Sequence, residues 1–468
     1  MEQGSIVKKM CEKTFQEEKN DILKFILDEK FFSKFTEDKL DFQRDTGINV
    51  ELYITSVCNQ KCSYCYLTKY GDELYPKEIR NWDMIFKNMR IFLDYLLERK
   101  FVIQDIDLFS GEIWGMKQGN KVLDILLEYK EKGLDFRKVM IPSNVSFLTN
   151  KNTTRVVQNY INKFRKLGVY LAFSASLDGL LIESRTRSYK DEKSNDKRND
   201  EFYENVMKFC SKNGFGFHPM ISAESIEQWP ENFDWWMDYL GRNRLDTRQY
   251  IMFLEVRNDY WTKDKIVSYL KFIDHVFDWE LENIFGGDKE SMIRHYFLPG
   301  PELKNYEILS LCPTPNYPNC TIGRGICVRL GDLAICPCHR TSYPHLLYGK
   351  FTVENDKIVG VEANNIQLAN KILLTSTRCT LKCDQCAYNE FCLRGCHGSQ
   401  FEATKDPMLP IESVCDLFMA KFNFLIYKWE KIGAFDFIKD QEIISAFQKR
   451  ILDGVKKIKN GGQYPYGN

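Results

Sequence analysis

Three cysteines, Cys58, Cys62 and Cys65, follow a strand-like apolar run with the spacing C-x3-C-x2-C. Cysteine thiolates are the ligands of iron–sulfur clusters, and an ordinary [4Fe–4S] cluster takes four of them. A loop with three thiolates would leave one iron open to a substrate, as catalytic metal sites leave a coordination position open. A zinc site would need a fourth ligand, and no His or Cys follows within the usual finger spacing. The trio therefore predicts a catalytic iron–sulfur cluster, with zinc or simple packing thiols as the alternatives.

A second group of cysteines lies in the final third of the chain and contains the run C-x2-C-x5-C-x3-C. Of the sixteen cysteines, only Cys11 and Cys210 stand apart from the two groups. Because thiols stay reduced in the cytoplasm, such clustering indicates metal ligands and not a disulfide framework. Cys379, Cys383 and Cys386 repeat the first spacing, but too few residues follow them to form a second catalytic domain. We expect further iron–sulfur clusters here, with zinc as the alternative.

The composition is typical of a globular protein, with 44% apolar residues. Sixty-five basic side chains balance sixty-five acidic ones, so the charge gives no sign of a nucleic-acid surface. No apolar run reaches the ~18 residues of a membrane span. The charged, amphipathic N-terminus lacks the apolar core of a secretory signal. We therefore expect a soluble, cytoplasmic protein with no nucleic-acid or membrane partner.

Short apolar runs alternate with longer amphipathic stretches between residues 50 and 256, which predicts an α/β fold with a parallel sheet. Six such units suit a partial, TIM-like (β/α)6 barrel better than a closed barrel of eight strands. The strand-like runs are 50–54, 106–109, 139–141, 169–173, 216–220 and 250–256. The expected domains are a helical extension over 1–48, the partial barrel over 49–300, a cysteine-rich domain over 301–420 and C-terminal helices over 421–468.

The first cysteine trio, with Tyr64 just before its last member, resembles the cluster motif of the radical S-adenosylmethionine (SAM) enzymes. The resemblance implies a partial (β/α)6 barrel and a [4Fe–4S] cluster whose open iron binds SAM and cleaves it to a 5′-deoxyadenosyl radical. The family usually has two glycines before a glutamate and a proline after it, where this chain has a serine, one glycine and no proline. The segments that resemble SAM-contacting strand ends are Ser110-Gly111-Glu112, Asn144, Ser176 with Asp178, Arg187, and Glu255.

The later cysteines resemble the SPASM extension of radical SAM enzymes, which binds two auxiliary [4Fe–4S] clusters. The first auxiliary cluster is then implied to take Cys312, Cys320, Cys396 and one of Cys336 or Cys338; the second takes Cys383, Cys386, Cys392 and Cys415. The distance from Gly331 favours Cys336, whereas the sequence Pro337-Cys338 favours Cys338, which we prefer. We interpret Cys327 and Cys379 as spare or buried thiols.

SPASM enzymes mostly modify peptides or proteins, so the resemblance implies hydrogen abstraction from such a substrate. We favour a maturase that installs a cross-link or another modification in a ribosomally made peptide, with flavodoxin or ferredoxin as the implied electron donor. The sulfatase-maturing subgroup generally has an acidic residue after the auxiliary Pro-Cys, whereas His339 and Arg340 follow here, which weighs against formylglycine formation. The alternatives are a radical SAM enzyme acting on a small-molecule cofactor precursor, a sulfatase-type formylglycine maturase and a non-catalytic, zinc-stapled interaction protein.

Overall fold

The computed structural model describes residues 48–243, 251–298, 325–364 and 395–460, together with 309, 311–312, 383 and 385–392. The chain folds into two compact units, each built from separate segments. The first unit comprises residues 1–176, 187–209 and 320–375, and the second comprises 177–186, 210–319 and 376–468. The helical extension predicted over 1–48 lies almost entirely outside the described residues, and the predicted domain boundaries stay a prediction.

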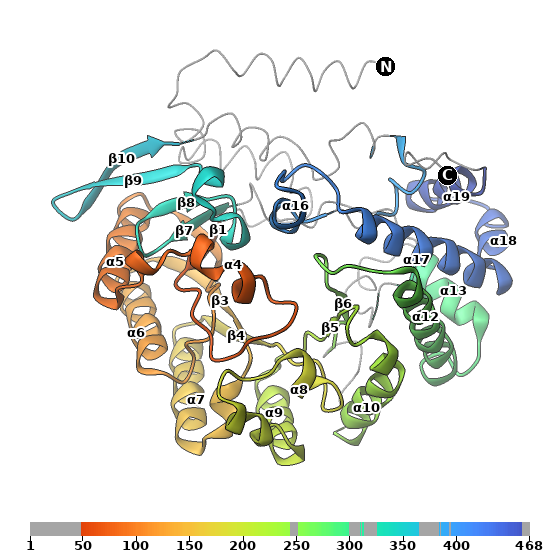
Figure 1. The fold of residues 1–468 in the computed structure, drawn as a ribbon, viewed down its shortest axis with the longest axis horizontal. Helices are drawn as coiled ribbons and strands as arrows, with labels where there is room; N and C mark the ends of the chain where they lie inside the picture. The colour runs from red at the N-terminus through yellow and green to blue at the C-terminus, as the bar shows by residue number, and fades with distance from the viewer. Residues whose placement is uncertain are drawn as a thin grey trace, which may run out of the picture. The chain divides into compact units, whose positions relative to one another are not determined.

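The first unit contains a sheet in the strand order β10-β9-β8-β7-β1-β2-β3-β4 (Figure 1). Four of its strands run parallel to one another: β1 (Ile48–Tyr53), β2 (Val102–Asp107), β3 (Asp135–Ser143) and β4 (Tyr170–Ala175). The helices between them are α4 (Tyr66–Leu74), α5 (Trp82–Glu98), α6 (Lys117–Glu131) and α7 (Lys151–Lys166). The predicted α/β class with a parallel sheet is thus confirmed.

Side-chain alternation along β1 explains how this sheet has two different faces. Ile48, Val50 and Leu52 are buried and apolar, whereas Asn49 and Glu51 between them point to the opposite face. The crossover helices begin where the sequence offers a cap: the Asn81 side chain accepts a hydrogen bond from the Met84 backbone at the start of α5, and Asn150 does the same for α7.

Four further strands from beyond residue 320 extend the same sheet. They are β7 (Gly325–Arg329), β8 (Ala334–Cys336), β9 (Gly349–Glu354) and β10 (Lys357–Ala363). β7 pairs in parallel with β1, while β8, β9 and β10 continue as antiparallel strands. A side chain at Gly325 would meet the backbone oxygen of Asn49 at 1.8 Å, so only glycine allows this pairing. The sequence analysis did not foresee these strands.

The second unit holds a short parallel pair, β5 (Met220–Ile221) and β6 (Leu254–Glu255). Its core is rich in aromatic rings, among which Trp229, Trp236 and Trp429 are fully buried. The larger helices of this unit are α10 (Trp229–Arg242), α12 (Lys263–Asn283), α13 (Lys289–Phe297), α16 (His397–Thr404), α17 (Glu412–Lys431) and α19 (Ala446–Lys459). Among the residues that the structure describes, no helix combines the length and apolar character that crossing a bilayer requires.

Candidate active site

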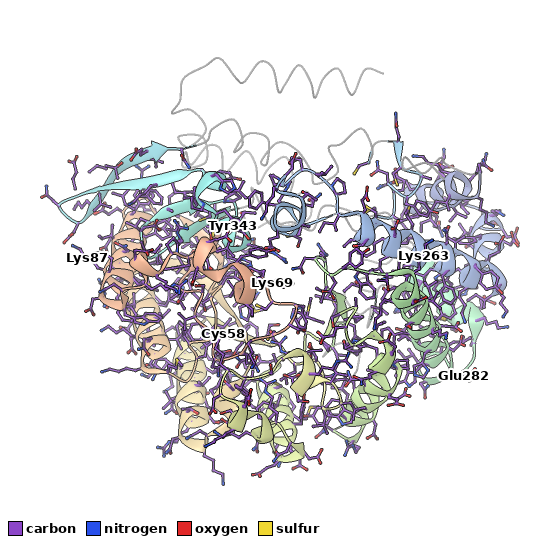
Figure 2. The ribbon with its side chains drawn as sticks, viewed as in Figure 1. Cys58, Lys69, Lys87, Lys263, Glu282 and Tyr343 are labelled. Carbon is purple, nitrogen blue, oxygen red and sulfur yellow. The ribbon has the colours of Figure 1, made fainter. Side chains whose placement is uncertain are left out.

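The cysteine loop, residues 54–65, leads from β1 into α4, and Cys58 lies within it (Figure 2). Cys62 is buried, Cys58 and Cys65 are half-buried, and all three side chains are reduced thiols. A neighbouring segment holds the loop in place, because the Lys61 backbone N–H donates to the Ser188 oxygen at 2.8 Å and the Lys190 N–H donates to the Asn59 oxygen at 3.0 Å. The three predicted ligands thus share one loop at the carboxyl end of a parallel strand, where such sheets place their active sites.

Burial raises the pKa of the Cys58 thiol to about 11, and the nearby Glu112 carboxyl adds to this effect. The thiol is therefore a proton carrier until a cation displaces the proton, which metal coordination does. Within the described ranges, no three Cys, His, Asp or Glu side chains converge on a point that would hold a single metal ion. The donor set, three thiols and no other ligand, fits an iron–sulfur cluster with one open iron.

The segment that follows β2 lies directly against the cysteine loop. Backbone N–H groups of Gly111 and Glu112 donate to the oxygens of Thr55 and Val57 at 2.8 and 2.9 Å. A Cβ atom at position 111 would lie 1.7 Å from the Val57 oxygen, so only glycine permits this approach. The departure from the usual pair of glycines therefore keeps the one glycine that the backbone contact requires.

Glu112 is buried, and its carboxylate accepts hydrogen bonds from the Asn144 backbone at 2.6 Å and from the Ser143 hydroxyl at 3.0 Å. Burial nevertheless raises the pKa of Glu112 to about 7, and these hydrogen bonds only partly offset it. A cationic ligand would stabilise the ionised form. The Ser110 hydroxyl oxygen nearby is buried and has no hydrogen-bond partner. A buried carboxyl and an unpartnered hydroxyl fit the ammonium end of an amino-acid ligand such as SAM.

Three more predicted residues of the first unit surround the cysteine loop. The Asn144 side chain donates to the Asn59 side-chain oxygen at 2.7 Å and lies 3.9 Å from the Cys58 sulfur. The Arg187 guanidinium donates to the Tyr64 hydroxyl at 2.5 Å. Ser176 ends β4, and its backbone N–H donates to the Ser143 oxygen. The first unit thus brings together the trio, Tyr64, Ser110-Gly111-Glu112, Asn144, Ser176 and Arg187.

The other two predicted SAM-contacting residues, Asp178 and Glu255, belong to the second unit, and partners within that unit engage their carboxylates. Asp178 is fully buried and accepts from the Thr186 hydroxyl at 2.7 Å and the Met220 backbone at 3.0 Å. Glu255 accepts from the Lys421 ammonium at 2.5 Å and from the Tyr269 hydroxyl. Burial opposes ionisation of Glu255, but the Lys421 charge outweighs it and lowers the pKa of the carboxyl. Both residues therefore anchor loops of this unit.

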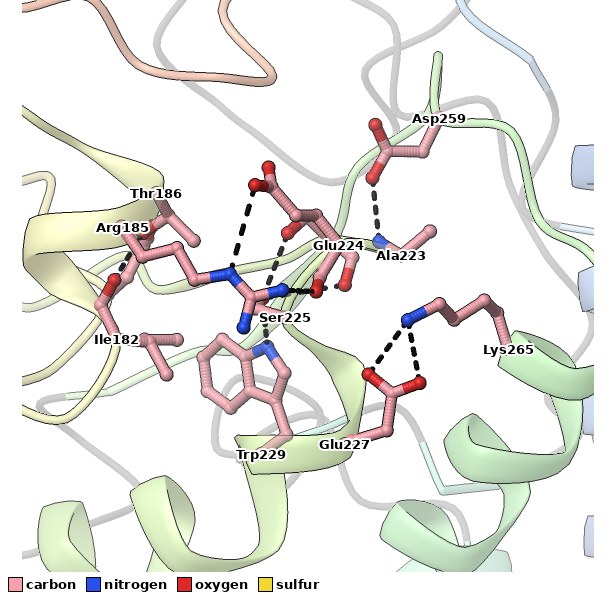
Figure 3. Close-up of polar contacts among 12 residues, drawn as sticks. Ile182, Arg185, Thr186, Ala223, Glu224, Ser225, Glu227, Trp229, Asp259 and Lys265 are labelled. Atoms are coloured by element: carbon pink, nitrogen blue, oxygen red, sulfur yellow. Dashed lines mark hydrogen bonds and ion pairs between the residues drawn. The ribbon is translucent and has the colours of Figure 1, made fainter.

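A polar network organises the loops around the carboxyl ends of β5 and β6 (Figure 3). The Asp259 carboxylate accepts from the Ala223 backbone at 2.7 Å, and the Ser225 hydroxyl accepts from the Trp229 indole at 3.1 Å. Arg185 donates to the Glu224 backbone oxygen. These contacts hold the loop after β5 in one conformation within the second unit.

Sequence reasoning missed a row of polar side chains on one face of the first unit's sheet. The strand register sets Cys336, Cys327, Glu51 and Asp107 side by side across β8, β7, β1 and β2. The Cys327 thiol donates to the Glu51 carboxylate at 3.2 Å, so this thiol is not a spare surface group. Burial, followed by repulsion from Glu51, raises the pKa of Asp107 to about 6. The signal was present only as separate polar residues in strands whose pairing was unknown.

His339 completes this row from the turn after β8. Its Nδ1 atom lies 2.7 Å from the Glu51 carboxylate, and its ring stacks on Phe109 with centroids 3.9 Å apart. Burial disfavours ionised Glu51, but the contact with His339 lowers the pKa of Glu51 overall. A histidine and a carboxylate in contact can share or pass a proton.

The predicted auxiliary ligands lie in both units. Cys338 is half-buried at the end of β8, with its sulfur 3.3 Å from the Thr341 hydroxyl, whereas Cys336 is buried in the sheet opposite Cys327. The two therefore have different surroundings, and the half-buried Cys338 is the more accessible ligand. In the second unit lie Cys312, Cys383, Cys386, Cys392, Cys396 and Cys415, while Cys320 and Cys379 fall outside the described residues.

Glu112 gives the apoprotein a distinct pH dependence. Its pKa of about 7 exceeds the unfolded value, so between these values the native state binds more protons and loses stability as pH rises. The loss amounts to about 3 kcal/mol between pH 4.5 and 8. We expect Glu112→Gln to remove most of this slope in urea unfolding at pH 5.5 and 8. The exposed control Glu131→Gln should keep the wild-type slope; an unchanged slope in Glu112→Gln would contradict the assignment.

No protein-family model matches the chain, and no curated protein matches its sequence. Solved structures do match. Native anSMEcpe with bound AdoMet has a TM-score of 0.54 and 15% identity, covering 83% of this chain and 100% of its own. A polyhistidine-tagged form of anSMEcpe with bound AdoMet has a TM-score of 0.52 and 15% identity, covering 87% and 98%. Native anSMEcpe with bound AdoMet and Kp18Cys peptide has a TM-score of 0.51 and 15% identity, covering 82% and 99%.

These structures are of an anaerobic sulfatase-maturating enzyme, a radical SAM protein of the SPASM type. The match extends over most of this chain and over nearly all of the other. The chain therefore has the radical SAM fold, as the sequence resemblance implied.

Proposed function

We propose that this chain, which has the radical SAM fold, is an enzyme that cleaves SAM reductively and abstracts hydrogen from a peptide or protein. The observation that carries the proposal is the backbone contact of Gly111 with the cysteine loop. This contact sets the buried Glu112 carboxyl and the Ser110 hydroxyl beside the three thiols. A site for the amino-acid end of SAM beside a three-thiol cluster loop is what radical SAM chemistry needs.

The residues of the first unit have distinct roles in this proposal. Cys58, Cys62 and Cys65 would hold a [4Fe–4S] cluster, which with SAM bound to its open iron supplies a 5′-deoxyadenosyl radical. Glu112 would accept hydrogen bonds from the SAM ammonium, and binding of that cation would lower the raised pKa of the carboxyl. Asn144, held by Asn59, and Arg187, held by Tyr64, would line the same site. Asp178 and Glu255 would act through the loops that they anchor.

A peptide or protein substrate is supported by the shared fold, because one of the matching structures contains a peptide together with AdoMet. Within this class we favour maturation of a ribosomally made peptide, with a cross-link or another modification as the product. Formylglycine formation is the second candidate, since the matching enzyme matures sulfatases. The residue after Cys338 weighs against it: His339 is engaged with the Glu51 carboxylate and is not itself an acid.

Two auxiliary [4Fe–4S] clusters on the later cysteines would relay electrons or bind the substrate. Their potentials would depend on hydrogen bonds and burial around the sulfurs. A low-potential flavodoxin or ferredoxin would supply the electron, and the reducing conditions that such a donor needs agree with a cytoplasmic location. A radical SAM enzyme acting on a small molecule would use the same site, so the substrate class needs its own test.

The proposal is tested with anaerobically reconstituted full-length protein. We expect about twelve irons and twelve sulfides per chain, and 5′-deoxyadenosine after addition of SAM and dithionite. Peptides encoded beside the gene and a sulfatase-derived peptide are then added separately and analysed by mass spectrometry. A mass change in the first supports the peptide maturase, whereas conversion of a cysteine in the sulfatase-derived peptide to an aldehyde, with oxygen in place of sulfur, would support formylglycine formation. Zinc in place of iron, with no 5′-deoxyadenosine, would overturn the enzyme assignment.

A further inference from the structure

Two polar side chains beside Cys396 are buried without hydrogen-bond partners. Ser399 and Gln400 are 0% and 1% exposed, and the Ser399 hydroxyl and both side-chain polar atoms of Gln400 have no partner. A buried amide or hydroxyl without a partner costs about 1–3 kcal/mol each. Such groups usually have an explanation in a bound water, an ion or a functional ligand.

Helix geometry brings both groups towards Cys396. Cys396 is the N-cap of α16, so Ser399 and Gln400, three and four residues later, lie on the same side of the helix. No side chain caps this helix end. The Gln400 backbone N–H donates to the Cys396 oxygen at 2.8 Å.

The Gln400 amide folds back to the residue that precedes Cys396. A Cβ atom at Gly395 would lie 2.8 Å from Gln400 Cδ and 3.0 Å from Nε2. Glycine at 395 is therefore what leaves room for the amide beside the cysteine. The helix N-terminus adds a partial positive charge at the same place, which favours an anionic partner.

We infer that Gln400 and Ser399 donate hydrogen bonds to the sulfurs of the auxiliary cluster that Cys396 ligates, and thereby raise its reduction potential. This inference rests on the proposed function, because it requires an auxiliary cluster at Cys396. A reduced cluster carries one more negative charge than the oxidised one, so donors to its sulfurs stabilise the reduced form. Both residues are positioning residues for the cluster environment and not ligands.

The test uses full-length protein in which Cys58, Cys62 and Cys65 are all changed to Ala, so that only auxiliary clusters give a signal. The clusters are titrated with dithionite, and their reduction is followed by EPR. In this background we expect Gln400→Leu to retain its iron and to lower the reduction equilibrium of one cluster about tenfold, which is 59 mV for one electron. Ser399→Ala should shift the same cluster in the same direction by less, and it is the smaller change should the leucine variant fold poorly.

Thr404→Val is the matched control, because Thr404 lies on α16 beyond Gln400 and its hydroxyl donates to the Gln400 backbone oxygen at 2.7 Å. It should leave both potentials unchanged. Full iron content with unchanged potentials in Gln400→Leu and Ser399→Ala would overturn the inference and leave the auxiliary clusters in place. Protein that binds no iron in this background would overturn the auxiliary clusters and the inference together.

Discussion

Cys62→Ala is expected to abolish 5′-deoxyadenosine formation and to lower the iron content by about four per chain. Cys62 is the buried member of the trio, on a loop whose backbone is held from both sides. An alanine removes a ligand that no neighbouring side chain can replace, since no other Cys or His converges there in the described part of the chain. Iron analysis and quantification of 5′-deoxyadenosine after anaerobic reconstitution measure the two effects.

Cys210→Ala provides the control for a general thiol effect. Cys210 is buried, and this burial raises the pKa of its thiol far above the usual value. It stands apart from both cysteine groups, so its loss should leave iron content and SAM cleavage unchanged. Equal loss of iron in the Cys62→Ala and Cys210→Ala proteins would contradict the assignment of the catalytic trio.

Lys421→Met is expected to destabilise the protein by about 3–5 kcal/mol. The Lys421 side chain is 0% exposed, and its ammonium is paired at 2.5 Å with Glu255, whose side chain is 7% exposed. Removing the lysine leaves a buried carboxylate without its counter-charge, which costs far more than the ion pair contributes over a neutral pair. Denaturant unfolding followed by tryptophan fluorescence reports the change, because Trp229 and Trp429 lie in the core of the same unit.

A second lysine on α17 supplies a matched comparison. Lys428 pairs with Asp274 and Asp278, whose side chains are 48% and 62% exposed. Pairs that face water contribute about 1 kcal/mol or less, so Lys428→Met should have a much smaller effect. The double change Glu255→Gln with Lys421→Met should recover much of the lost stability. Equal losses for the two lysine variants would show that burial of the Glu255 pair is not what matters.

The sequence by itself determined the chemistry that is local along the chain. The C-x3-C-x2-C spacing confines three thiols to one loop, whatever the rest of the chain does. The alternation of strands and helices predicted the parallel sheet, and such sheets collect their carboxyl ends at one edge. For that reason Glu112 and Asn144, which follow different strands, could be expected near Cys58, and the structure places them there.

Only the tertiary structure decided the contacts between distant segments. The pairing of β7 with β1 sets Cys327 against Glu51, and His339 reaches the same carboxylate from 288 residues away. Lys421 meets Glu255 across 166 residues. No local pattern encodes such pairs, because strand register and helix packing depend on the burial of whole faces and not on the spacing of a few residues. The same is true of Gln400, whose missing partner becomes visible only once its burial is known.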